Sequence, residues 1–377
     1  MLFFWNSTVI LFFIGEVMKK ICFLVDSWFF GEHSGIYTFI KHYATLISKL
    51  EGYKLDIITD HVVERKYLED SVFSEVGFFT GPSFENQIYG EIEDSIVSYC
   101  EKLNDYVKDN EPILIVSHSF MATKAMCGVT TNAKKMVYTH IGDILDGKKS
   151  TIYDFSEEYV KEHLLILSND NSILIGTQNN SLVDVLERIV GDKERIKHLP
   201  EPFYHPKPYR SNPSGPVIII SSNYKRKNLE DMVRIVSKNK MGLMLIAGEW
   251  EEESCKPIEY IIKDNCEGLE SSVVYRQIPN KRIHRFISKC SAMLHMSSIE
   301  VMPYAILEAM LHVPVIINSD SIWGKCFPFS SVYRFSLSDD IDIKDIIANH
   351  DIDKAINEVG EYSRLSEEYW FNFLGGL

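Results

Sequence analysis

The chain has 377 residues, 45% of them hydrophobic and 24% charged, which excludes a disordered, collagen-like or coiled-coil protein and favours two domains over one. Its 39 basic and 53 acidic side chains give a formal net charge of −14. Such an acidic surface argues against binding DNA or anionic lipid over the whole molecule, although it leaves room for a local basic cleft.

The start of the chain does not have the pattern of a targeting signal. Residues 1–14 are mostly apolar and a lysine pair follows them, whereas a signal peptide carries its positive charge before the apolar run. The run is also shorter than the roughly 20 residues that span a bilayer. The codons of Gly15 and Glu16 can form a ribosome-binding site just before the codon of Met18. We therefore expect a natural start at Met18 and a translated leader over 1–17; the alternative is a short hydrophobic anchor.

Alternating strands and helices are predicted through the first half of the chain. The run KICFLVD at 20–26 is rich in β-branched and aromatic residues, which is typical of a strand buried on both faces. Apolar residues recur with helical spacing between 36 and 50, and KLDIIT at 54–59 predicts the next strand. Further strands are expected at 113–117, 136–140 and 172–177. This order is typical of a parallel α/β sheet.

A proline-rich polar stretch from Pro200 to Pro216 interrupts the series and is the best candidate for a linker. A second α/β series follows it. Its expected elements are strands at 217–221, 243–247, 273–276, 292–295 and 315–318, helices at 228–238, 281–290 and 304–311, and a final helix over about 351–373. Two such halves place a cleft between two sets of strand carboxyl ends, where these sheets bind ligands.

Two glutamates flank the turn between a predicted strand and helix. The glycine-rich dinucleotide fingerprint is missing after the first strand. Instead, Glu300 falls in the loop after the strand at 292–295, and Glu308 lies in the apolar string AILEAML of the next helix. The helix N-terminus offers free N–H groups to a phosphate, and a carboxylate two turns further on can bridge the hydroxyls of a ribose. The alternative is that both are ordinary solvated helix charges.

At this point the sequence resembles a known family. The stretch SSIEVMPYAILEAMLHVPVII at 297–317 is similar to the donor-site segment of retaining GT-B glycosyltransferases of the family-four type. SSNYKRKNLEDM at 221–232, LMLIAGE at 243–249 and, more loosely, VYTHIGD at 137–143 follow the family's pattern in order. The resemblance implies an α/β fold of the GT-B type, with two Rossmann-like domains that face a cleft. The domains would be an acceptor domain over 18–205 and a nucleotide-sugar domain over 206–350, and a C-terminal helix over 351–377 would pack back on the first domain.

The resemblance also implies roles for individual residues. Lys227 would neutralise the donor diphosphate, and Ser222 stands where the family has an arginine, so Lys225 or Arg226 would replace that charge. Glu308 would hold the ribose. The remaining expected contacts are Glu300, with the segment Val301, Met302, Pro303 and Tyr304, for the transferring sugar, Gly35 for the donor phosphates, and His140 for the reacting sugar or the acceptor hydroxyl. Because Val301 replaces a glycine of the family, the sugar's identity stays open.

The family's chemistry needs neither a metal nor a tightly bound cofactor, and its co-substrate is a nucleotide sugar, here expected to be a UDP-sugar. GIYTF at 35–39, SHSFMATKAM at 117–126 and VYTHIGDIL at 137–145 look like stretches of the phage DNA α-glucosyltransferases. The best expectation is therefore transfer to a 5-hydroxymethylated pyrimidine in duplex DNA, and the alternative acceptor is a lipopolysaccharide or other glycan. A non-catalytic GT-B-like binding protein is the alternative of another class.

The expected location is the cytoplasm, the host's if a phage encodes the protein, without stable insertion into a membrane. Seven scattered cysteines without a CxxC pair agree with reduced thiols. A DNA acceptor would require a local cationic rim. Its candidates in the first domain are His61, Arg65, Lys66, Lys124, Lys134, Lys135, Lys148 and Lys149.

Overall fold

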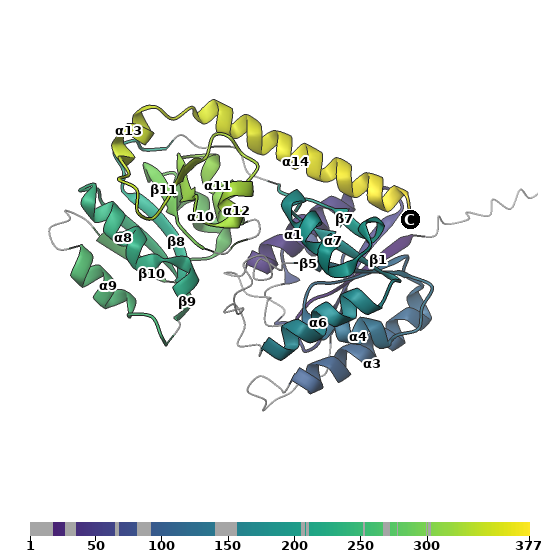
Figure 1. Ribbon diagram of the computed structural model, residues 1–377. Coiled ribbons are helices and arrows are strands. Elements are labelled where there is room, and N and C mark those ends of the chain that lie inside the picture. Colours follow the sequence, from purple (N-terminus) through teal and green to yellow (C-terminus); the bar gives the residue numbers. More distant parts are fainter. Residues whose placement is uncertain are drawn as a thin grey trace, which may run out of the picture.

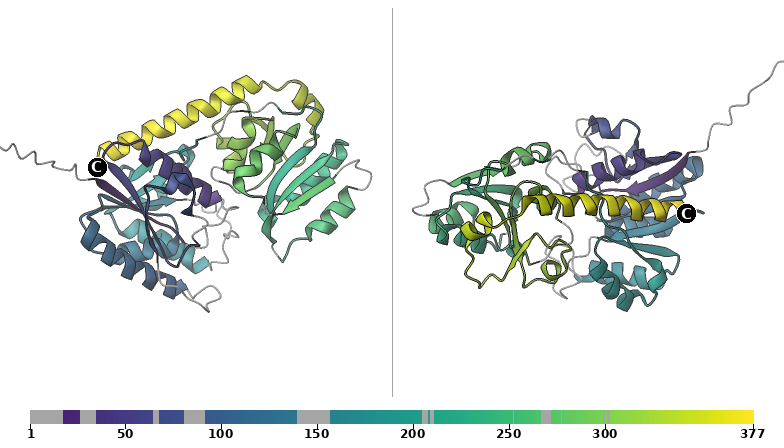
Figure 2. Two further views of the ribbon diagram at one scale, coloured as in Figure 1. Left: turned by 180° about the vertical axis from the view of Figure 1, so that it is seen from behind. Right: turned by 90° about the horizontal axis from the view of Figure 1, so that it is seen from above.

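The computed structural model contains two α/β domains, each built on a parallel sheet (Figure 1). It describes residues 18–26, 35–64, 68–80, 92–139, 157–204, 208, 211–251, 253–266, 272–276, 278–298, 300 and 303–377. The long helix α14 (Ile352–Gly375) starts over the second domain and ends over the first, and both views of Figure 2 show it bridging the two. The expected α/β fold class with two domains is confirmed.

The first sheet has seven strands in the order β3-β2-β1-β4-β5-β6-β7, and all its neighbouring strands are parallel. The strands are β1 (Lys19–Leu24), β2 (Tyr53–Thr59), β3 (Gly77–Thr80), β4 (Leu114–Ser117), β5 (Lys134–Thr139), β6 (Ile173–Thr177) and β7 (Ile196–His198). Among the described residues, the helices of this domain are α1 (Gly35–Ser48), α3 (Ile92–Asn110), α4 (Phe120–Gly128), α6 (Glu157–Asn169) and α7 (Asn180–Val190), with 3-10 turns at Ser71–Phe73 and Lys193–Arg195. The strand order reverses between β1 and β4, which defines a topological switch point.

The second sheet has six strands in the equivalent order, β10-β9-β8-β11-β12-β13, and is also parallel. Its strands are β8 (Val217–Asn223), β9 (Leu243–Glu251), β10 (Ser272–Arg276), β11 (Ala292–His295), β12 (Val315–Asn318) and β13 (Tyr333–Phe335). Its helices are α8 (Leu229–Lys238), α9 (Ile258–Asn265), α10 (Asn280–Ile287), α11 (Tyr304–Met310), α12 (Ile322–Cys326) and α13 (Ile343–Ala348), with a 3-10 turn, η4, at Lys225–Lys227. Here the switch point lies between β8 and β11.

Alternation along the central strands divides the apolar core between the two faces of each sheet. In β1, Ile21 and Phe23 belong to one cluster, whereas Cys22 and Leu24 belong to another on the opposite face. The first of these clusters is continuous with apolar residues of the second domain, among them Ile218 of β8. The two domains therefore share one core along their contact, in addition to a core of their own on the far face of each sheet.

Contacts between α14 and the segment after β7 tie the ends of the fold together. The Trp370 indole Nε1 and the Ser366 hydroxyl both donate to the Pro200 carbonyl, at 2.9 and 2.8 Å. The Trp370 ring lies edge-on to Tyr43 of α1, with ring centroids 4.7 Å apart, and Glu367 pairs with Lys49 at the end of that helix. The aromatic residues of the C-terminal helix thus pack on the first domain.

Most strands and helices expected from the sequence are present, with ends displaced by a few residues. The strand expected at 136–140 begins earlier, at Lys134, and ends at Thr139. The sequence reading missed β3, β7 and β13, which are three or four residues long, and the short helices α9, α12 and α13. Segments of this length carry too few periods of the hydrophobic pattern to be recognised. The leader over 1–17 lies outside the described residues.

Candidate active site

A cavity of about 290 Å³ opens at the carboxyl edge of the second sheet, around the ends of β8, β9 and β11. This is the switch point of that sheet, where α/β folds hold their ligands. The cavity is lined by Thr38, Ile220, Ser221, Ser222, Lys227, Ile246, Ala247, Gly248, Ile278, Ile283, His295, Glu300, Pro303, Tyr304, Ala305 and Glu308. Six of the residues selected from the sequence therefore lie around one cavity, and Thr38 of α1 adds a wall from the first domain.

The turn η4 carries Lys227, which lines the cavity, and Arg226, which reaches Glu300 without lining it. The turn is fixed by the residue that follows it. Asn228 has a left-handed backbone with φ of 53°, which asparagine tolerates better than most residues. Its side-chain amide donates to the Met296 carbonyl at 2.8 Å and to the Ser298 hydroxyl at 2.9 Å. The Ser298 amide in turn donates to the Arg226 carbonyl at 2.7 Å. The loop with the lysines and the loop with Glu300 are thus joined into one unit.

Glu300 is surrounded by three donors. Its Oε1 pairs with the Lys227 ammonium, accepts a hydrogen bond from His295 Nε2 at 3.1 Å, and lies 3.9 Å from the Arg226 guanidinium. Burial alone would raise the pKa of this carboxyl, but Lys227, His295 and Arg226 outweigh burial and hold the pKa of Glu300 well below its ordinary value. With His295 neutral, the cluster beside the cavity has two positive charges and one negative charge, so its net charge is positive.

Glu308 lies inside α11 on another wall of the cavity, and only 8% of the residue is exposed. Burial raises the pKa of its carboxyl to about 8, so the group is largely protonated at neutral pH. Its Oε1 lies 3.9 Å from Nε2 of His284, whose Nδ1 is 3.0 Å from Nε2 of His312. A buried carboxyl that lines a cavity can bind hydroxyl groups in either protonation state.

Tyr304, the first residue of α11, connects the cavity to the contact between the domains. Its hydroxyl donates to the Pro202 carbonyl at 3.3 Å and lies against the buried carboxyl of Glu201. Its ring packs on His42 of α1, with centroids 5.1 Å apart. The segment that leads from the first domain to the second is therefore held by the helix that also carries Glu308.

Ser222 and Gly248 shape the floor of the cavity. A Cβ atom added to Gly248 would come within 2.3 Å of the Ser222 hydroxyl oxygen. Only a residue without a side chain allows β8 and β9 to approach there without displacing Ser222. The glycine of the LMLIAGE segment is thus required by packing beside the cavity, which is a structural reason for the pattern noted in the sequence.

The other residues selected from the sequence are placed less centrally or fall outside the described part. Neither Lys225 nor Arg226 lines the cavity. Lys225 is exposed at the start of η4, whereas Arg226 is largely buried and lies 3.9 Å from Glu300. Gly35 is the first residue of α1, three residues before Thr38. His140, Val301 and Met302 lie outside the described residues.

Two of the lysines expected in a cationic rim for DNA do not lie where that rim would be. Lys134 and Lys135 were expected in or near loops, but they begin β5, so they lie at the amino edge of the sheet, opposite the edge that faces the cleft. Lys135 donates to the Val129 carbonyl at 2.8 Å, and Lys124 pairs with Glu162 at 2.9 Å. His61 follows β2, and Arg65, Lys66, Lys148 and Lys149 lie outside the described residues.

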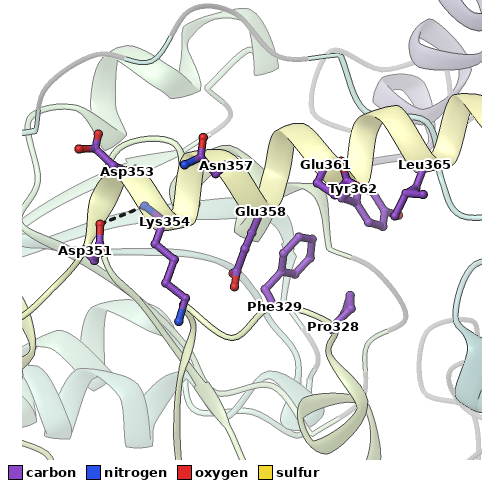
Figure 3. A pocket seen from close by; sticks show the side chains of 10 residues that line it. All are labelled: Pro328, Phe329, Asp351, Asp353, Lys354, Asn357, Glu358, Glu361, Tyr362 and Leu365. Atoms are coloured by element: carbon purple, nitrogen blue, oxygen red, sulfur yellow. Dashed lines mark hydrogen bonds between the residues drawn. The ribbon is translucent and has the colours of Figure 1, made fainter.

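A larger hollow of about 620 Å³ lies elsewhere, between the first half of α14 and the loop after α12 (Figure 3). Three of the five charged residues that line it are already used within the fold, and the other two, Asp353 and Lys354, are exposed to solvent. Glu358 accepts hydrogen bonds from the backbone and hydroxyls of Ser330 and Ser331, and Glu361 pairs with Arg364. Asp351 caps the start of the helix. The hollow is therefore a structural junction and not the place where unused polar groups converge.

Several residues at the cavity were not selected from the sequence. His295 was placed at the end of a strand and Asn228 at the start of a helix, without a role for either. The available signal was a histidine that ends an otherwise apolar strand five residues before Glu300. Thr38 could not have been found, because its place depends on how the two domains meet.

The described ranges contain neither a candidate metal site nor a candidate membrane span. No group of three or more His, Cys, Asp or Glu residues there could hold a metal ion. No helix in the same ranges is long and apolar enough to cross a membrane.

Two parallel-sheet domains that meet at a cleft, each with its switch point toward the other, define the GT-B fold. No protein-family model matches the chain, and no curated protein matches it in sequence. Solved structures do match in fold. Sucrose-phosphate synthase from Thermosynechococcus elongatus superposes with a TM-score of 0.67 at 15% identity, over 93% of this chain and 94% of that one.

Two further solved structures also match this chain in fold, one without a ligand and one with ligands bound. The lipopolysaccharide outer core galactosyltransferase WaaB in its apo form has a TM-score of 0.62 at 15% identity, and the match covers 95% of this chain and 100% of that one. A TarM variant from S. aureus in complex with fondaparinux, α-GlcNAc-glycerol and UDP has a TM-score of 0.53 at 15% identity, over 73% of this chain and 55% of that one. At these identities the likeness establishes the GT-B fold.

Proposed function

We propose that this protein is a retaining glycosyltransferase of the GT-B type, which moves a sugar from a nucleotide sugar to an acceptor hydroxyl. The observation that carries the proposal is the cavity at the switch point of the second sheet. It combines a net positive cluster of Lys227, Arg226 and Glu300 with the buried carboxyl of Glu308. The names of the structures with the same fold agree with this class of enzyme.

The proposed roles are those that the family resemblance implies, and the positions of these groups are compatible with them. Lys227 and Arg226 bind the diphosphate, Glu308 binds the ribose hydroxyls, and Glu300 contacts a hydroxyl of the transferring sugar. In the reaction the bond between the anomeric carbon and the diphosphate oxygen breaks. A new bond forms between that carbon and the acceptor oxygen, whose proton is released as the nucleoside diphosphate leaves. The cationic pair stabilises the charge that develops on this leaving group.

The donor base and the acceptor are finer parts of the proposal. A UDP-sugar is the expected donor, and one structure with the same fold was solved with UDP. A glycan acceptor has the support of the lipopolysaccharide galactosyltransferase among the similar structures. A glycan acceptor also agrees with the position of Lys134 and Lys135, which begin β5 and so do not contribute to a basic rim at the cleft. The 5-hydroxymethylated pyrimidine in DNA, which was the first expectation from the sequence, becomes the second candidate; it is carried by the sequence stretches at 35–39, 117–126 and 137–145.

A thermal-shift panel of nucleotide sugars tests the donor proposal. A donor at a hundred times its dissociation constant should stabilise the fold by about 2.7 kcal/mol. The stabilisation should be lost in Lys227→Ala and kept in the matched control Lys225→Ala, because Lys225 does not line the cavity. If no nucleotide sugar raises the melting temperature, the proposal is wrong. Binding without turnover of any donor would favour the non-catalytic binding protein.

The donor identified in that panel is then used to compare candidate acceptors with one another. Glycan fragments are tested beside matched duplexes that contain cytosine or 5-hydroxymethylcytosine. Transfer to the modified duplex should fall steeply with salt, with a slope of about −0.9 per phosphate contact, whereas donor hydrolysis should barely change. Transfer to a glycan alone would eliminate the DNA acceptor, and transfer only to the modified duplex would eliminate the glycan.

A further inference from the structure

His295 is a polar residue at the end of an otherwise apolar buried strand. It ends β11, whose side chains are all buried, and only 3% of the histidine is exposed. Buried histidines need a hydrogen-bond partner to offset the loss of water. Its partner is the carboxylate of Glu300, five residues further along the chain.

The hydrogen bond fixes the protonation of the imidazole. Burial lowers the pKa of His295 below its ordinary value, despite the opposing effect of Glu300. The ring is therefore neutral near pH 7, and the nitrogen that faces the carboxylate, Nε2, carries the proton. Nδ1 has no hydrogen-bond partner in the described part of the chain, which suits a nitrogen without a proton.

The ring is also held in place from the other side. It lies edge-on to the Trp323 ring, with centroids 5.8 Å apart and the planes at 86°. The Trp323 indole Nε1 donates to the Ser297 carbonyl at 2.8 Å. His295 is thus a rigidly supported donor.

His295 differs from the other two donors of Glu300 in its charge. Lys227 and Arg226 are cations beside the cavity, and an incoming diphosphate competes for both of them. The neutral imidazole lacks the charge that attracts the two cations to the diphosphate, and its N–H is already bonded to Glu300. When the cations turn to the phosphates, His295 is the donor that stays on Glu300 Oε1.

We propose that His295 is a positioning residue, which keeps the carboxylate of Glu300 aimed at a hydroxyl of the transferring sugar once Lys227 and Arg226 have moved to the diphosphate. This inference rests on the proposed function. It predicts that His295 affects the sugar part of the donor and the turnover, whereas binding of the nucleoside diphosphate alone does not depend on it.

Three substitutions separate the hydrogen bond from the packing. His295→Phe keeps a ring against Trp323 and removes the donor. His295→Gln places an amide N–H near the position of Nε2, and His295→Asn places it near the position of Nδ1, too short to reach Glu300. We expect kcat to fall by about 10- to 100-fold in His295→Phe and His295→Asn, with recovery in His295→Gln. Melting temperature and affinity for the nucleoside diphosphate are measured in every variant.

The outcomes distinguish this inference from the proposed function. Wild-type turnover together with an unchanged kcat in His295→Phe would overturn the inference alone. Equal losses in all three variants, or a parallel loss of affinity for the nucleoside diphosphate, would show a packing role and also overturn it. If the wild type binds a donor without turnover, the same comparison is made on donor affinity relative to the nucleoside diphosphate. If the wild type binds no nucleotide sugar, both proposals are wrong.

Discussion

Lys227 is the residue whose replacement tests the electrostatics of the cavity most directly. Its ammonium pairs with Glu300, and the side chain is only 14% exposed, so solvent screens it weakly. At about 4 Å and an effective dielectric constant of 20, two unit charges attract by about 4 kcal/mol. A diphosphate has more than one charge, but Arg226 remains beside the cavity and retains part of the attraction. We therefore expect Lys227→Ala to lose about 3 kcal/mol of transition-state stabilisation, which is roughly 100-fold in kcat/KM.

The assay is the initial rate of donor hydrolysis or transfer, measured over a range of donor concentrations. Lys227→Met keeps the apolar stem and should lose as much activity as Lys227→Ala, because the loss comes from the charge. The matched control Lys225→Ala, at an exposed position, should change the rate by less than about threefold. Activity of Lys227→Ala within about threefold of the wild type would refute the reasoning and transfer the phosphate role to Lys225 or Arg226.

Three further predictions concern the carboxyls, the left-handed turn and the C-terminal helix. The raised pKa of about 8 for Glu308 means that the folded state binds more protons than the unfolded state above about pH 4.5. The free energy of unfolding should therefore fall as the pH rises from about 4.5 to 8. Urea titrations at several pH values should show a weaker pH dependence of this free energy in Glu308→Gln, and an unchanged pH dependence would contradict the raised pKa. Asn228→Gly loses two hydrogen bonds and should lower the free energy of unfolding by about 1–3 kcal/mol. Asn228→Ala should lower it by about 1 kcal/mol more, because alanine is strained in the left-handed backbone. Equal values for the two variants in urea unfolding would contradict the argument from backbone strain. Trp370→Phe should lower the unfolding free energy by about 1–3 kcal/mol through the lost bond to Pro200 and the smaller ring against Tyr43, and a change under about 0.5 kcal/mol by calorimetry would mean that the helix packs loosely.

The fold could be predicted from the sequence where apolar runs were long and turns were marked. The strands expected at 217–221 and 292–295 and the helix after Pro303 were recognised because each combines a buried apolar pattern with a polar or proline boundary. Short edge strands such as β13 carry three residues and no readable period. Their place depends on pairing with a neighbour that is distant in sequence.

The candidate site could be predicted only in part for the same reason. Glu300, Glu308 and Lys227 were selected through motif spacing, and the structure brings all three to one cavity. The pairing of Lys227 with Glu300 joins residues 73 positions apart, and the contribution of Thr38 comes from the other domain. No local pattern contains such contacts, because they arise from the crossover order of the sheet and from the meeting of two domains.

The most direct test of the central claim is the release of nucleoside diphosphate from a nucleotide sugar that stabilises the fold. The wild-type protein should release it slowly without an acceptor and faster when the correct acceptor is added. Glu300→Gln should bind the nucleoside diphosphate but lose most of this release, because the carboxylate that faces the sugar is gone. A protein that releases no nucleoside diphosphate from any stabilising donor, or a Glu300→Gln variant as active as the wild type, would contradict the account.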